Sequence, residues 1–176
     1  MIQSPFSKLK DVQLFRCSGN QFLGSLLNQS LKLKSLTLEG RNGNLPYLNF
    51  VNNDLDISIL KMENYFVQDQ NNCNFLSHCK NLQTLELEEV DVELLNVPQH
   101  ALSPKKLTLG NNINSFQQLS PLFLTLEVLE VSCINVIPAS LQFDFPKLEH
   151  LSWDFGFDIL QTAPNLKVNN LFFSDS

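Results

Sequence analysis

The clearest structural signal in the sequence is the stretch Asn81-Leu82-Gln83-Thr84-Leu85-Glu86-Leu87-Glu88-Glu89-Val90-Asp91-Val92. It reads L-x-x-L-x-L, and further apolar positions follow after two residues. Successive side chains of a strand point to opposite faces, so the L-x-L part suits a short strand with one buried face. Leu85 and Leu87 are therefore predicted to face a core, and Glu86 and Glu88 to face outward.

The same pattern recurs along nearly the whole chain. Its first position falls at residues 9, 33, 57, 82, 104, 126, 148 and 168, so successive starts lie 24, 24, 25, 22, 22, 22 and 20 residues apart. A second apolar register stands seven residues before the starts, at Ile2, Leu26, Phe50, Phe75, Val97, Leu119 and Leu141. A third stands three residues before the starts, at Phe6, Cys79, Ala101, Phe123 and Phe145. Apolar registers that keep a constant offset from one another over so many units indicate that the units stack, because one such unit cannot bury its own apolar face.

These registers resemble the leucine-rich repeat superfamily, whose units are 20–29 residues long, from about Phe6 to Phe173. The family places Asn or Cys after the second x-x. Cys17 and Asn112 match that position, whereas Tyr65 and Val90 depart from it. The resemblance implies an α/β fold: a leucine-rich repeat solenoid of about eight repeats, with a curved parallel sheet on its concave side. Short helices, 3₁₀ turns or loops are expected on the convex side.

The return segments are predicted to differ along the chain. The earlier units are longer and leave room for longer helices, such as one over Gly19 to Gln29, and Phe75 to Cys79 suits a single helical turn. We interpret residues 1–176 as a single leucine-rich repeat domain. Neither end shows the polar cap that a stack of repeats needs. Two explanations stay open: the chain is a fragment of a longer solenoid, or another segment or subunit covers its ends.

The segment Cys79-Lys80-Asn81-Leu82 is similar to the cysteine-containing repeats of F-box proteins. That local resemblance implies an alternative function, the substrate-recognition part of an SCF-type ubiquitin ligase receptor. No F-box is visible in the sequence, so a Skp1-like subunit is expected as a partner only if an F-box exists outside this chain.

The candidate binding residues are those that the strands turn outward on the predicted concave face. They are Thr37, Glu39, Lys61, Glu63, Glu86, Glu88, Thr108, Glu130 and Asp154. Acidic side chains dominate this set, and complementary charge favours a protein partner with a basic segment. The simpler alternative is that these side chains only solvate an exposed sheet. Lysines gather where the strands begin, which predicts a basic rim at Lys8, Lys10, Lys32, Lys34, Lys80, Lys105, Lys147 and Lys167.

The sequence carries no recognisable catalytic or cofactor motif. The residues His150, Ser152 and Asp154 alternate along one strand, and side chains two positions apart lie about 6.5–7 Å from one another, too far for a hydrogen-bonded triad. Cys73, His78 and Cys79 lack a second pair of zinc ligands at suitable spacing. Neither phosphate-binding glycine motif, G-x-x-x-x-G-K-[ST] or G-x-G-x-x-G, occurs. We therefore expect a noncatalytic scaffold with no cofactor and no metal.

Composition narrows the partners and the compartment. The net charge of -6 and the pI of about 4.9 disfavour nucleic acid as a partner. No apolar run has the length of a membrane span, and the first ten residues lack the apolar core of a signal peptide. The chain has four cysteines, and they do not cluster as the cysteines in the caps of secreted repeat proteins do. This distribution favours a reducing compartment, the cytoplasm or the nucleus.

Overall fold

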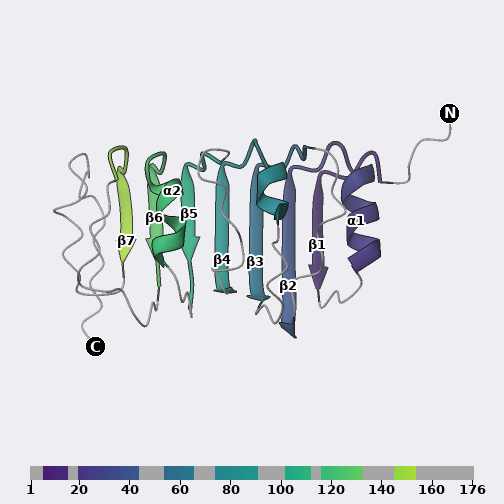
Figure 1. Cartoon of the computed structure of the whole chain (residues 1–176), viewed down its shortest axis with the longest axis horizontal. Coiled ribbons are helices and arrows are strands. Elements are labelled where there is room, and N and C mark those ends of the chain that lie inside the picture. Colours follow the sequence, from purple (N-terminus) through teal and green to yellow (C-terminus); the bar gives the residue numbers. More distant parts are fainter. Residues whose placement is uncertain are drawn as a thin grey trace.

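A computed structural model describes residues 6–15, 20–43, 54–65, 74–90, 102–111, 116–132 and 145–153. These residues form the strands β1 (Asp11–Phe15), β2 (Ser35–Gly43), β3 (Ile59–Tyr65), β4 (Thr84–Val90), β5 (Lys106–Leu109), β6 (Val128–Val131) and β7 (His150–Trp153). All seven belong to one sheet, every neighbouring pair is parallel, and the order in space follows the order in the sequence (Figure 1). The predicted parallel sheet of sequential strands is thus confirmed.

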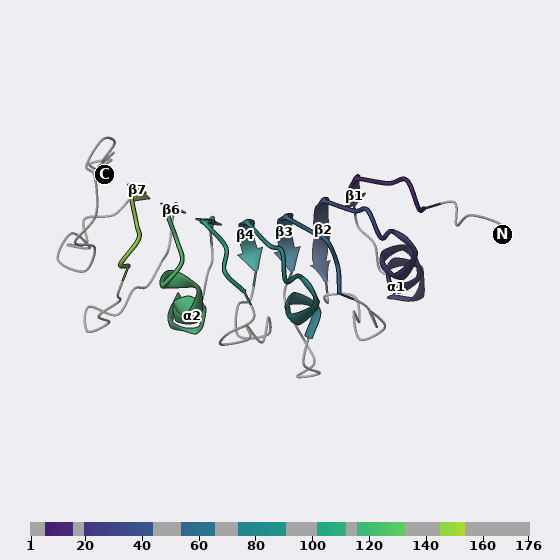
Figure 2. The same cartoon turned by 90° about the horizontal axis from the view of Figure 1, so that it is seen from above.

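The helical segments lie on one side of this sheet. They are α1 (Asn20–Gln29), the 3₁₀ helices η1 (Asn74–His78) and η3 (Phe116–Leu119), and α2 (Ser120–Phe123). Figure 2 shows α1 and α2 beneath the strands, which follow a shallow arc that opens away from the helices. The molecule therefore has two layers, and the other face of the sheet is not covered by any described residue.

The strand register places the repeated apolar pattern in one column. Leu38, Met62, Leu87, Leu109 and Val131 pair in turn across β2 to β6, and each of these side chains is at most 2% exposed. Their neighbours two positions earlier form a second buried column of Leu36, Leu60, Leu85, Leu107 and Leu129. Burying these leucines removes much apolar surface from water, the main favourable contribution to folding. The prediction that they face the core is confirmed.

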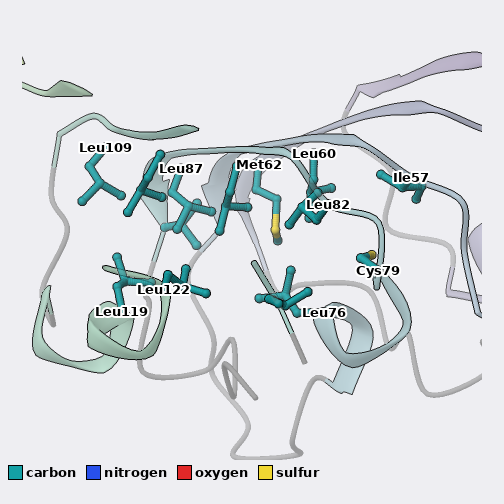
Figure 3. Close-up of a cluster of buried hydrophobic side chains, with 14 of the residues drawn as sticks. Ile57, Leu60, Met62, Leu76, Cys79, Leu82, Leu87, Leu109, Leu119 and Leu122 are labelled. Carbon is teal, nitrogen blue, oxygen red and sulfur yellow. The ribbon is translucent and has the colours of Figure 1, made fainter. Parts of the chain in front are cut away.

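The return segments close the core from the helical side. Figure 3 shows Leu76, Leu119 and Leu122 facing Met62, Leu87 and Leu109 of the sheet. In the register seven residues before the starts, Leu26 and Leu119 are buried as predicted, and the remaining side chains lie outside those that the structure describes.

The register three residues before the starts holds the turn from each return segment into its strand. Cys79, Phe123 and Phe145 are buried there, and the rings of the two phenylalanines have centroids 4.7 Å apart. The same turn recurs because the backbone N–H of the start residue donates to the carbonyl at this register, as from Leu82 to Cys79 over 3.0 Å.

The helices agree with the predicted shortening of the later return segments. The helix expected over Gly19 to Gln29 is α1, which begins at Asn20, and the turn expected over Phe75 to Cys79 is η1. The later return segment at 116–123 holds only η3 and α2, four residues each. The proposed eighth unit at 168–173 lies outside the described residues.

The β1 end of the sheet differs from its middle. In Figures 1 and 2, α1 lies at that end of the sheet. Val12 and Leu14 of β1 are only partly buried, although they pack against the same core as the columns of β2 to β6. None of the described helices has the length and apolar character that crossing a membrane requires.

Candidate functional site

The face of the sheet that points away from α1 and α2, here called the open face, carries the outward side chains of all seven strands. Because strand residues alternate, the outward residues fall into three rows; β1 to β4 contribute to all three, and the shorter β5 to β7 contribute to the first two. The entry row is Asp11, Ser35, Ile59, Thr84, Lys106, Val128 and His150. The middle row is Gln13, Thr37, Lys61, Glu86, Thr108, Glu130 and Ser152, and the exit row includes Phe15, Glu39, Glu63 and Glu88.

Eight of the nine predicted binding residues lie on the open face. Thr37, Lys61, Glu86, Thr108 and Glu130 share its middle row, and Glu39, Glu63 and Glu88 pair side by side in its exit row. All eight are half-buried. Asp154 lies outside the described residues. The arrangement brings the eight onto one surface, and whether they bind a partner stays a prediction.

Two lysines of the open face are neutralised by neighbouring carboxylates. Lys61 lies 3.6 Å from Glu63 of its own strand, and Lys106 of β5 lies 2.8 Å from Glu130 of β6. The Thr108 hydroxyl donates a second hydrogen bond to Glu130 over 3.0 Å. Burial alone would raise the pKa of Glu130, but the hydrogen bonds from Lys106 and Thr108 outweigh it and lower that pKa below its ordinary value. Glu130 is therefore a charged group already held by this chain.

Three other carboxylates of the open face carry no ion pair within the described part of the chain. They are Glu39 on β2 and Glu86 and Glu88 on β4, and we call them the acidic patch. Glu39 and Glu88 stand on either side of Glu63 in the exit row. Like charges placed opposite one another on neighbouring strands are unfavourable. The patch thus concentrates carboxylates that form no ion pair with a described cation, although Lys61 of β3 stands opposite Glu86.

The edge of the sheet where the strands begin carries acidic side chains beside the lysines of the predicted basic rim. Lys34 pairs with Asp56, whose second carboxylate oxygen accepts a hydrogen bond from Asn81 over 3.0 Å. Lys80 lies 2.7 Å from Asp54. Acids from the neighbouring unit thus occupy the same edge and pair with part of the predicted basic rim.

The charge pairing recurs further along this edge. Lys105 lies 2.9 Å from Glu127, one unit further along the chain. Both Lys34 with Asp56 and Lys105 with Glu127 are separated by 22 residues, about one repeat. That spacing is a regularity of the sequence, but it does not identify the pairs, because Lys80 lies 26 residues from its partner Asp54. Lys167 lies outside the described residues.

The open face also holds an apolar residue that the repeat pattern does not reveal. Ile59 stands at an x position of L-x-x-L, a place that the pattern leaves to polar residues, and is 43% exposed. It pairs with Ser35 of β2 and Thr84 of β4, both of which are small. Phe15, at the β1 end, is 58% exposed.

The structure describes only part of the two residue sets considered for catalysis and for zinc binding. His150 and Ser152 lie two positions apart on β7, and their possible partner Asp154 lies outside the described residues. His78 is half-buried, Cys79 is buried, and Cys73 also lies outside the described residues. Within the described ranges, no three His, Cys, Asp or Glu side chains gather closely enough to hold a metal ion.

Comparisons of the chain with family models, with curated proteins and with solved structures find no match.

Proposed function

We propose that the chain is a leucine-rich repeat solenoid that works as a noncatalytic scaffold and binds a protein partner on its open face. Three findings support the repeat assignment: units of 20–25 residues, a sequential parallel sheet, and buried apolar columns at the same place in each unit from β2 to β6. Each unit adds one strand, and the strands together form an extended surface about 4.8 Å wider per strand. Such a surface suits a partner that contacts several units at once.

The acidic patch is the observation that carries the binding proposal. Glu39, Glu86 and Glu88 lie on a sheet face that no described residue covers, and no described cation forms an ion pair with them. A partner with lysines or arginines would relieve their mutual repulsion and would be drawn to the face over a distance. We therefore propose that the partner presents a basic segment, in the cytoplasm or the nucleus.

Charge reversal within the patch tests this proposal. Glu86→Lys combined with Glu88→Lys is expected to abolish capture of basic protein partners from cell extract, and raising the salt concentration is expected to weaken capture by the unchanged protein. Asp54→Lys combined with Glu127→Lys changes the net charge equally but lies on the rim, and should leave capture intact. Capture that survives reversal of the patch would rule the open face out as the docking surface.

A second candidate function is substrate recognition in an SCF-type ubiquitin ligase. The segment Cys79-Lys80-Asn81-Leu82 supports it, and this segment forms a tight turn in which Cys79 is fully buried. The same capture experiment separates the two candidates. Recovery of a Skp1-like or cullin-like subunit favours the ligase, whereas recovery of a basic protein alone favours the scaffold.

A further inference from the structure

The exposed Ile59 and the acidic patch lie on adjacent strands in a fixed order. The register pairs Ile59 of β3 with Thr84 of β4, then Lys61 with Glu86, then Glu63 with Glu88. Going along the strands, the open face therefore offers an apolar level, a level where Glu86 of β4 stands beside Lys61 of β3, and a level with a glutamate on both strands. Each level is about 6.5–7 Å from the next, because outward side chains recur every second residue.

This order matches the side-chain spacing of another extended chain. In an extended segment, the side chains at positions one, three and five point the same way and are separated by the same distance. A segment lying along β3 and β4 could thus place one side chain over Ile59, the next beside Glu86 and the third beside Glu88. A helical segment would bring its side chains together at different intervals.

The neighbours of each level decide which side chains fit. Ile59 is 43% exposed between the small residues Ser35 and Thr84, so an apolar side chain placed there would bury surface on both partners. Glu86 and Glu88 carry no ion pair with a described cation, and the neighbouring Lys61 contacts Glu63. Cationic side chains at these two levels would find carboxylates that are not held in an ion pair within the described residues.

We propose that the partner contributes an extended segment of the pattern apolar-x-basic-x-basic, in either chain direction, with its apolar residue on Ile59 and its basic residues on Glu86 and Glu88. The inference rests on the proposed function and adds the chemistry and spacing of the partner. In this proposal Ile59 determines specificity by binding the apolar side chain of the partner, and Glu86 and Glu88 recognise its basic side chains.

Binding of short fluorescent peptides, followed by anisotropy, tests the spacing. One peptide carries the proposed pattern, one carries its reverse, one has the same composition with the apolar residue between adjacent lysines, and one has serine in place of the apolar residue. The better of the first two is expected to bind about tenfold more tightly than the last two, the effect of burying one aliphatic side chain.

Variants of the protein locate the contacts. Ile59→Ser should remove the tenfold preference while keeping salt-dependent binding of all four peptides. Glu86→Gln with Glu88→Gln should weaken every peptide, whereas Glu127→Gln, which removes a carboxylate from the rim, should weaken none. Circular dichroism of each variant confirms that the fold is kept.

The outcomes separate this inference from the proposed function. All basic peptides could bind equally to the original protein and still be lost in the variant with Glu86→Gln and Glu88→Gln. That result would overturn the proposed spacing of the partner's side chains, and the scaffold function would remain supported. Binding of no basic peptide by the folded, unchanged protein would overturn both. Self-association in analytical ultracentrifugation that disappears in Ile59→Ser would instead identify a second copy of this chain as the occupant, and would overturn the proposed peptide.

Discussion

Asn64 of β3 and Glu89 of β4 lie side by side and share a left-handed backbone conformation, with φ of 59° and 51°. The pairs Glu63 with Glu88 and Tyr65 with Val90 flank them in the register. Asparagine tolerates this conformation, whereas most other residues with a side chain adopt it at a cost of about 1–2 kcal/mol. The two neighbouring units thus make the same local turn, with Asn64 well suited to it and Glu89 poorly suited.

Replacing Glu89 by asparagine is therefore expected to stabilise the protein. The free energy of unfolding should rise by about 0.5–1 kcal/mol, because asparagine relieves part of the strain at positive φ. Urea denaturation followed by circular dichroism measures it. Glu88→Asn provides the control, since it makes the same substitution one residue earlier, where φ is not positive. A Glu89→Asn protein no more stable than the original would contradict the strain.

Gly110 lies close to the side chain of Glu88, and its lack of a Cβ permits this approach. A Cβ at Gly110 would stand 2.8 Å from Cγ, 3.1 Å from Cβ and 3.3 Å from Cα of Glu88. We expect Gly110→Ala to lower the free energy of unfolding by about 1 kcal/mol, because the new methyl group overpacks this contact. Adding Glu88→Ala should recover part of the loss, a coupling that a double-mutant cycle in urea measures. Strictly additive effects would show that the two residues do not restrain each other.

Ser30 occupies the same place in its unit as the buried Cys79, Phe123 and Phe145. Its side chain is only 2% exposed, and its hydroxyl has no hydrogen-bond partner among the described residues. Ser30→Ala should raise the free energy of unfolding by about 1 kcal/mol, since it removes a buried, unsatisfied polar group. The matched change Cys79→Ala should lower it by about 1–3 kcal/mol, because it leaves a cavity. If thermal and urea unfolding show both changes to be destabilising, the Ser30 hydroxyl has a partner.

Asp56 links three units at the rim through Lys34 and Asn81. The hydrogen bond from Lys34, followed by that from Asn81, lowers the pKa of Asp56 below its ordinary value of 3.8. Because the folded pKa is the lower one, this stabilisation is present above pH 3.8 and is lost as pH falls through the folded pKa. The pair is exposed, so its contribution is at most about 0.5 kcal/mol.

Asp56→Asn should remove that part of the acid dependence. The difference between the unfolding free energies of the original and the variant should be largest near neutral pH and at low salt, and should shrink as the pH falls through the lowered pKa of Asp56. An NMR titration of Asp56 checks the direction of the pKa change directly. A carboxyl that titrates at or above its ordinary value would show that Lys34 does not hold it in solution.

Periodicity in the sequence predicted the parts of the fold that depend on which way a side chain faces. Leu60 and Met62 are buried, and Lys61 between them faces outward, as alternation along a strand requires. The helix α1 and the turn at Cys79 also lie where apolar spacing and turn residues predict them. These features follow from local geometry repeated in each unit.

Contacts between units could not be derived in the same way. The pairing of Lys34 with Asp56 depends on which acid of the next unit reaches the same edge, and the exposure of Ile59 depends on its small neighbours Ser35 and Thr84. Likewise, β4 makes the same turn as β3, but it has a glutamate, Glu89, where β3 has the better suited Asn64. The strain at Glu89 follows from that difference. Spacing along one chain predicts the face of a residue and leaves its lateral partners open.

Every strand of the described sheet contacts only the strands that precede and follow it in the sequence. Within the described sheet, no strand pairs with one that is not its neighbour in sequence order, in contrast to sheets whose strands cross over. A gene duplication that inserts one strand with its return segment would therefore lengthen the array without breaking any existing non-adjacent pair. Such an architecture allows evolution to change the length of the surface independently of its local chemistry.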